Sequence, residues 1–343
     1  MASSRRLWAA LQGVICVHKP ADTHLASLKK RIIAQIVEQG NQAWEGRPPK
    51  EIELPIVTEG ESGAIWITGT KKQPDYSEHP LVVGPMLHPQ DVLVEELGDM
   101  EPTTSGICLL GLNDGCEQLP GILERAWPSR YRLEGILGRQ TVDNEIKGRV
   151  MESGQYEPVS RGRMQKVISK MLANFRRLSF ELSGVDAQSE AAFEMARKGI
   201  PRPSIPGQLL VQKMDLAVWA PPYFALDLTC SGETDATLRN FVLQIGGSVG
   251  TVASPTKLIR LGVGPFLPEH ALLWKQLNLQ NIVRNIAANR KMLTDFKADQ
   301  SPVFEEAEPV SVVKGLLDTK KLNSADDEEV DAMRPYWGRE YEK

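Results

Sequence analysis

The sequence predicts an α+β fold, because short β-branched runs and amphipathic helical stretches follow one another in irregular order. Apolar runs such as 13–17 and 223–230 are typical of strands, while 25–37 and 167–178 repeat apolar residues at helical spacing. The regular strand–helix–strand rhythm of a doubly wound α/β protein is absent, and we find no internal repeat. These observations favour an α+β fold over a doubly wound α/β fold.

The first part of the chain supplies two expected strands and one helix. Residues 13–17 predict a strand that ends in a turn at His18-Lys19-Pro20. Residues 25–37 predict a helix. Its apolar positions are Leu25, Leu28, Ile32, Ile33, Ile36 and Val37. Residues 40–62 are rich in Gly, Pro and Glu and are expected to form a loop or insertion, and 65–68 a strand.

The middle of the chain predicts most of the remaining sheet. The expected strands are 104–111, 131–137, 210–218 and 223–230, the last two joined by a turn at Pro221-Pro222. A helix is expected at 167–178, surrounded by basic residues. These are Arg161, Arg163, Lys166, Lys170, Arg176 and Arg177. A further helix is expected from Leu238 to Ile245, ending at Gly246-Gly247, and helix-like residues 271–292 should close the domain.

Charge divides the chain into a nearly neutral body and an acidic tail. Of 44 acidic and 40 basic residues, 12 and 6 lie in residues 299–343, so the net charge of −4 comes from the tail. We therefore expect a main domain at 13–297 and an acidic, disordered tail at 298–343. No apolar run approaches the roughly 20 residues needed to span a bilayer.

Residues 1–12 have the composition of a short mitochondrial presequence. Arg5 and Arg6 lie among serines and apolar residues, and no acidic residue precedes Asp22. A ragged N-terminus would look the same.

Four widely spaced cysteines without a C-x-x-C pair argue against a disulfide framework or a zinc site. They are Cys16, Cys108, Cys116 and Cys230.

Common catalytic signatures are missing from the sequence. It has no P-loop, no G-x-G-x-x-G after a strand, no H-E-x-x-H and no G-x-S-x-G elbow. These absences argue against NTPases, dinucleotide oxidoreductases, zinc proteases and α/β-hydrolases.

Six segments in order resemble the TruB-type pseudouridine synthases. Gly98-Asp-Met-Glu-Pro-Thr-Thr-Ser-Gly106 is similar to the family signature G-x-L-D-P-x-A-S-G. The others are Gly13 to Pro20, the strand ending at Gly111, Tyr131 to Gly148, Ala192 to Gly199 and Cys230 to Arg239. The run His79-Pro-Leu-Val-Val-Gly-Pro85 further resembles the mitochondrial branch of the family. Each match is weak alone, but six in the right order over residues 13–266 identify the family.

The resemblance implies a pseudouridine synthase fold, with a mixed central sheet, flanking helices and a long cleft into which an RNA uridine is flipped. Many members of the family carry an RNA-binding PUA domain, for which we expect the tail at 298–343 to be too short. It places Glu101 at the catalytic aspartate, Arg239 at its arginine partner and Tyr131 at the stacking tyrosine. It implies RNA as the partner, no metal and no diffusible cofactor, and a mitochondrial location. We also expect RNA contacts from basic residues along the cleft and the basic helix. They are Lys19, Arg130, Lys170, Arg176 and Arg177.

Departures from the family pattern leave three interpretations open. Glu101 replaces the aspartate of G-x-L-D-P-x-A-S-G, and Ser129 replaces the lysine of the family's K-x-Y. Asp235-Ala236-Thr237 replaces the G-T-Y of the family segment C-S-x-G-T-Y-I-R. The chain could be an enzyme that uses Glu101, an inactive RNA-binding or ribosome-assembly protein, or an interaction scaffold. An extra methylene moves a carboxylate by up to about 1.5 Å, and an error of about 1 Å can cost on the order of 10²-fold in rate.

Overall fold

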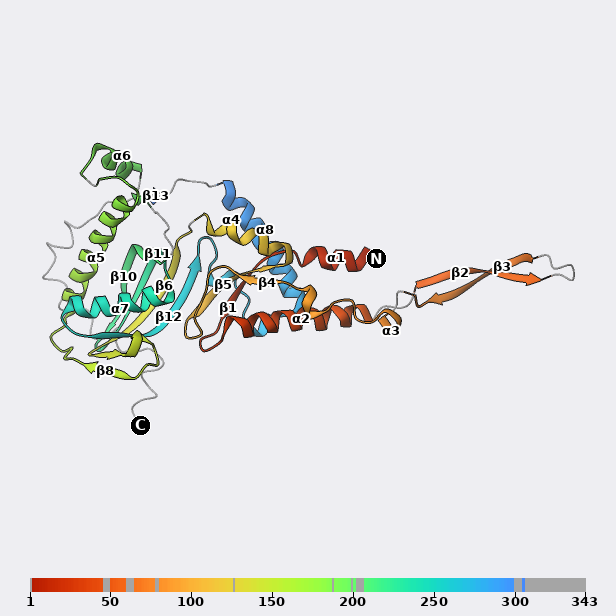
Figure 1. Cartoon of the computed structure of the whole chain (residues 1–343), viewed down its shortest axis with the longest axis horizontal. Helices are drawn as coiled ribbons and strands as arrows, with labels where there is room; N and C mark the ends of the chain where they lie inside the picture. Colours follow the sequence, from red (N-terminus) through yellow and green to blue (C-terminus); the bar gives the residue numbers. More distant parts are fainter. Residues whose placement is uncertain are drawn as a thin grey trace.

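A computed structural model describes most of the chain outside its C-terminal tail (Figure 1). The described residues are 2–45, 50–59, 65–77, 80–125, 127–186, 188–198, 200–201, 207–298 and 304–305. They contain a seven-stranded mixed sheet in the order β1-β5-β12-β6-β11-β10, with β4 paired to β5. The expected α+β class with a mixed sheet is confirmed.

Five of the seven sheet strands match expected runs: β1 (Gly13–Lys19), β5 (Ser105–Leu112), β6 (Ser129–Leu137), β10 (Leu210–Ala220) and β11 (Tyr223–Ser231). The other two, β4 (Val94–Glu96) and β12 (Ala253–Val263), were not expected from the sequence. The longer helices are α1 (Ala2–Ala10), α2 (Leu25–Glu45), α5 (Arg161–Leu182), α6 (Glu190–Lys198), α7 (Asp235–Val249) and α8 (Leu279–Ala298). Short helices are α3 (Pro80–Val83) and α4 (Leu119–Leu123).

One half of the sheet consists of β1, β5 and β4, packed against α2 and α8; we call it the N-terminal half. The stripe of α2 buries Leu28, Ile32 and Ile36 completely. They pack with Ile15 and Val17 of β1 in one hydrophobic cluster. This burial explains why the periodic stretch forms a helix, since its apolar face needs a sheet to cover it.

The first residues contribute to this half of the fold. Leu11 is completely buried, and its carbonyl oxygen accepts a hydrogen bond from Asn113 Nδ2 at 3.1 Å. Leu7, on α1, packs against the same cluster. These contacts do not test whether residues 1–12 direct import, but they make the end of the expected presequence part of the folded core.

The other half, the C-terminal half, consists of β12, β6, β11 and β10, with α5 and α7 packed against it. The alternation of β6 buries Tyr131, Leu133 and Leu137 on one face. Met164 and Ile168 of α5 join the same hydrophobic cluster. Each half therefore has its own apolar core.

The two halves meet where β5 runs beside β12. The strands are parallel there and pair only through Ser105 with Ile259 and Gly106 with Arg260. Gly106 has φ +117°, and a Cβ at this position would lie 2.1 Å from the carbonyl oxygen of Arg260. Glycine thus permits the close approach of the two backbones. We call this junction the seam.

A two-stranded hairpin replaces much of the loop that was expected at 40–62. That expectation was wrong, because α2 continues to Glu45 and β2 (Lys50–Glu59) pairs with β3 (Ile65–Asp75). The hairpin projects away from the sheet (Figure 1). Every second residue of β2 is apolar, but Ile52, Leu54 and Ile56 remain about 40% exposed.

Two helix boundaries also differ from expectation. Gly246-Gly247 does not end α7, which continues to Val249 and is capped by Gly250 at φ +87°. Gly246 instead lets the helix approach Ala253 of β12, whose nitrogen would lie 2.6 Å from an added Cβ. The C-terminal helix begins only at Leu279, because the residues before it form short 3₁₀ turns.

The expected disordered tail at 298–343 lies almost wholly outside the described residues. Within it, β13 (Phe304–Glu305) pairs with β9 (Ile200–Pro201). None of the helices in the described part of the chain is long and apolar enough to cross a membrane.

Candidate active site

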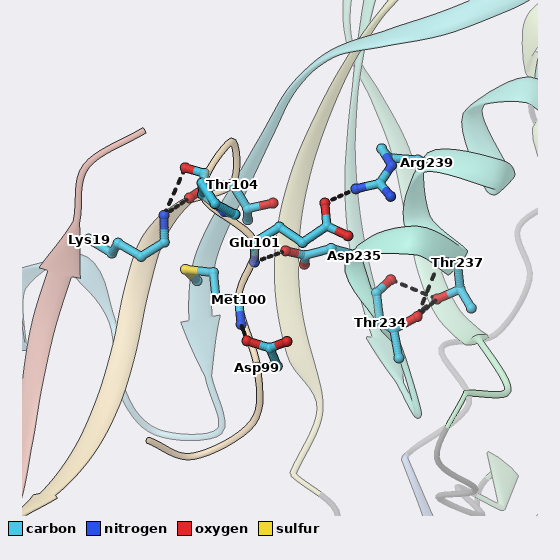
Figure 2. Close-up of polar contacts among 10 residues, drawn as sticks. Lys19, Asp99, Met100, Glu101, Thr104, Thr234, Asp235, Thr237 and Arg239 are labelled. Carbon is cyan, nitrogen blue, oxygen red and sulfur yellow. Dashed lines mark hydrogen bonds and ion pairs between the residues drawn. The ribbon is translucent and has the colours of Figure 1, made fainter. Parts of the chain in front are cut away.

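Glu101 lies in the turn that enters β5, at the seam (Figure 2). The turn is closed by a hydrogen bond from the Thr104 backbone N–H to the Glu101 carbonyl oxygen, at 3.2 Å. Lys19, at the end of β1, donates from its Nζ to the carbonyl oxygens of Pro102 at 3.0 Å and Thr104 at 2.5 Å. These contacts hold the turn against the N-terminal half.

Lys19 therefore has a different role from the expected one. The prediction that it contacts RNA is wrong for this conformation, because the side chain is completely buried. Burial lowers the pKa of Lys19 to about 8, and the nearby Asp235 carboxylate partly counters this effect. Its ammonium group donates hydrogen bonds to backbone carbonyl oxygens.

Helix α7 holds Glu101 from the C-terminal half. Arg239 Nη1 donates to Glu101 Oε2, and the two side chains are 14% and 35% exposed. The Glu101 backbone N–H donates to Asp235 Oδ2 at 2.7 Å. The helix begins with a capping box, in which the Thr234 hydroxyl accepts from the Thr237 N–H at 3.2 Å and the Thr237 hydroxyl accepts from the Thr234 N–H at 2.8 Å.

A cavity of about 320 Å³ opens beside Glu101. Tyr131 lies in its wall, is only 2% exposed, and has a pKa raised well above the ordinary value because burial disfavours the phenolate. Other lining residues are Leu97, Asp99, Leu109, Trp127, Glu233, Asp235 and Arg260. The structure thus places Glu101 and Tyr131 in the wall of one cavity, with Arg239 paired to the Glu101 carboxylate. Their catalytic roles stay a prediction.

The residues expected to bind RNA are not gathered at this cavity. Arg130 follows Ser129 on β6 and is exposed on the face opposite Tyr131. Lys170 and Arg177 are exposed on α5, Arg176 is partly buried there, and Arg177 pairs with Glu181 at 3.2 Å. These side chains could meet phosphates only outside the cavity.

Two buried charged residues of the site were not singled out from the sequence. Asp235 is 7% exposed, and burial raises the pKa of its carboxyl group. Arg260 is 6% exposed, and its Nε donates to the Ile107 carbonyl oxygen at 2.6 Å, across the seam. The replacement of G-T-Y was a signal for Asp235, but its use as a backbone acceptor is visible only in three dimensions.

The described part of the chain contains no cluster of three or more His, Cys, Asp or Glu side chains able to hold a metal ion. The cavity wall presents the Glu101 carboxylate, which is paired with Arg239, together with aromatic surface from Tyr131 and Trp127. It also contains further charged side chains, those of Asp99, Glu233, Asp235 and Arg260.

Comparison with known proteins points to one family. Residues 95–235 match the model described as TruB family pseudouridylate synthase (N terminal domain). The chain is 27% identical over 319 residues to pseudouridylate synthase TRUB2, mitochondrial, of Homo sapiens, which covers 92% of this chain and 91% of that protein. The Mus musculus protein of the same name is 28% identical over 282 residues, covering 82% and 84%.

Solved structures show a weaker similarity. The crystal structure of the archaeal box H/ACA sRNP Nop10–Cbf5 complex aligns with a TM-score of 0.41 at 12% identity. The alignment covers 81% of this chain and 54% of that chain, so it spans about half of the solved protein's length.

Proposed function

We propose, from the premise that this chain belongs to the TruB family of pseudouridine synthases, that it isomerises uridine to pseudouridine in RNA with Glu101 as the catalytic carboxylate. The observation that carries the proposal is the ion pair of Glu101 with Arg239 at the wall of a cavity that Tyr131 also lines. A carboxylate fixed by an arginine beside a buried aromatic side chain meets the demands of the reaction.

Each of the three residues has a separate task in this proposal. The flipped uracil enters the cavity and stacks on Tyr131. The Glu101 carboxylate acts on the ribose as nucleophile or base while the N1–C1′ bond of the uridine breaks. The base then turns, a C5–C1′ bond forms, the hydrogen on C5 leaves as a proton, and N1 takes up a proton, so that the product is an isomer of uridine. Arg239 keeps the carboxylate ionised and fixed in one rotamer.

The length of glutamate is compatible with this role because both ends of the residue are held. Arg239 binds the carboxylate, and Asp235 binds the backbone N–H. The reactive group is therefore placed by its partners, and the extra methylene need not make it mobile.

We further propose that RNA outside the cavity is held by Arg130 and by the basic face of α5, with Lys170, Arg176 and Arg177. Exposed Arg and Lys side chains are the usual partners of phosphates.

The relatives named mitochondrial and the acid-free start of the chain support mitochondrial RNA as the substrate. Fractionation of cells that produce the full chain with a C-terminal tag would place it in the matrix; a cytosolic pool alone would contradict this location.

The test uses unmodified tRNA transcripts labelled with tritium at C5 of uridine, because bond formation at C5 releases the label into water. We expect release by the wild-type protein and a loss of at least about 100-fold in Glu101→Ala. The matched control is Glu95→Ala, a change of an exposed glutamate on β4 that should leave the rate unchanged.

RNA binding, measured with the same transcripts, distinguishes the enzyme from an inactive RNA-binding protein. RNA binding by the wild-type protein without release, with turnover appearing only in Glu101→Asp, would favour an inactive RNA-binding protein. Charge reversal at Lys170, Arg176 and Arg177 should abolish binding. Unchanged binding would contradict the proposed RNA surface.

A further inference from the structure

One turn of α7 holds Glu101 at two points. Asp235 is the first residue of the helix and Arg239 follows four residues later, so both side chains lie on the same helix face. Asp235 accepts a hydrogen bond from the Glu101 backbone N–H, and Arg239 binds the Glu101 carboxylate (Figure 2). Glu101 thus spans two anchors that are fixed relative to each other.

The start of the helix is itself well fixed. Thr234 and Thr237 form reciprocal hydrogen bonds around the first turn. Leu238, between the two anchors, is completely buried in the C-terminal core. Motion of either anchor would therefore require disruption of the capping box or of core packing.

A glutamate at this position needs such an anchor more than an aspartate does. It has one more rotatable side-chain bond, so binding the carboxylate alone leaves the backbone of the turn less well determined.

We propose that Asp235 is a positioning residue, which fixes the Glu101 backbone through the N–H···Oδ2 hydrogen bond and so compensates for the length of the glutamate side chain. The inference rests on the proposed function for its effect on catalysis. Its structural part, the hydrogen bond across the seam, does not depend on turnover.

Lys19 supports the same turn but cannot replace this anchor. It binds the carbonyl oxygens of Pro102 and Thr104, beyond Glu101, and it belongs to the N-terminal half. The hydrogen bond to Asp235 instead ties the backbone of Glu101 itself to the helix that carries Arg239. Loss of Asp235 should therefore shift Glu101 relative to the cavity without removing the turn.

Two variants separate the hydrogen-bond acceptor from the charge and the bulk of the side chain. Asp235→Ala removes the acceptor, and Asp235→Asn keeps an oxygen at nearly the same place. With the labelled transcripts, we expect kcat to fall about 10- to 100-fold in Asp235→Ala, with KM changed less than about 3-fold. Asp235→Asn should recover most of kcat, to within about 3-fold of wild type.

Amide hydrogen exchange at Glu101 gives a readout that does not need activity. The Glu101 N–H should exchange at least about 10-fold faster in Asp235→Ala and near the wild-type rate in Asp235→Asn. Asp215→Ala, a change of an exposed carboxylate on β10, is the control and should alter neither quantity.

The outcomes distinguish the two proposals. Faster exchange in Asp235→Ala from a wild-type protein that has no turnover would support the anchor and contradict the proposed enzyme. Unchanged exchange and unchanged kcat in Asp235→Ala would overturn the anchor. Equal losses in the Ala and Asn variants would also overturn it, since the negative charge rather than the acceptor would then matter.

Discussion

The two halves of the sheet are built alike but contribute differently to the candidate site. The N-terminal half supplies the turn with Glu101 and, through Lys19, its support. The C-terminal half supplies Tyr131, Asp235 and Arg239. Each half has its own hydrophobic cluster, and a third, smaller cluster crosses between β5 and the end of β12. The site is thus assembled where two independently packed regions join.

Because each half supplies part of the candidate site, the contacts among the site residues are also contacts between the two halves. The β5–β12 ladder has only two paired positions, so the polar contacts of Glu101 and Arg260 add substantially to the junction. A site residue cannot be judged by catalysis alone, since its loss also weakens the seam.

The largest effect should come from Gly106→Ala, which breaks the seam directly. The new Cβ would overlap the Arg260 carbonyl oxygen, and φ +117° is unfavourable for alanine. We expect the free energy of unfolding to fall by about 3 kcal/mol or more, measured by urea denaturation.

Gly121→Ala is the matched control for that experiment. Apart from its chain neighbours and the backbone of its own helix, an added Cβ at Gly121 in α4 would meet no atom within 4 Å. The change should leave the free energy of unfolding unchanged or raise it by up to about 1 kcal/mol, because alanine is favoured over glycine in a helix. Equal stability of the two variants would contradict the close approach of β5 and β12.

A smaller effect on the free energy of unfolding is expected from Lys19, which supports the Glu101 turn from the N-terminal half. The pKa of Lys19 is about 8 when folded, against about 10.5 for an ordinary lysine. Between these values the unfolded chain binds more protons, so the free energy of unfolding should rise with pH. From pH 7.5 to 9.5 the rise from this group should be about 1–2 kcal/mol.

Urea denaturation across this pH range, compared between wild type and Lys19→Met, measures the contribution of the lysine. The variant should be less stable overall and should lack this part of the rise, whereas Lys166→Met, at an exposed site on α5, should keep it. An equal pH dependence in Lys19→Met and wild type would show that the buried ammonium is not the source.

Much of the fold could be predicted from the sequence because its strands and helices bury regular apolar faces. The stripe of α2 and the alternation of β6 are examples. Part of the second hairpin strand was expected at 65–68, but the first strand was missed, because Gly, Pro and Glu around it suggest a loop and its apolar side chains remain exposed. Gly246 was misread as a helix end, since only the packing of α7 on β12 reveals that its missing side chain is needed.

The site was predictable only in part, for a related reason. Glu101, Arg239 and Tyr131 were found because each lies in a segment with a recognisable order of residues. The roles of Lys19 and Asp235 depend on backbone atoms far away in the chain, such as the Thr104 carbonyl oxygen and the Glu101 N–H. Backbone partners leave no side-chain pattern, so these roles required the structure.

The position of the site at the seam has a consequence for ligand binding. A nucleotide that contacts both Glu101 and Tyr131 binds well only when the two halves are docked, so occupancy and docking are thermodynamically linked. An RNA that fills the cavity would then raise the melting temperature even where no bond is broken or formed. By the same reciprocity, any change that strengthens the seam should tighten RNA binding at a distance from the RNA itself.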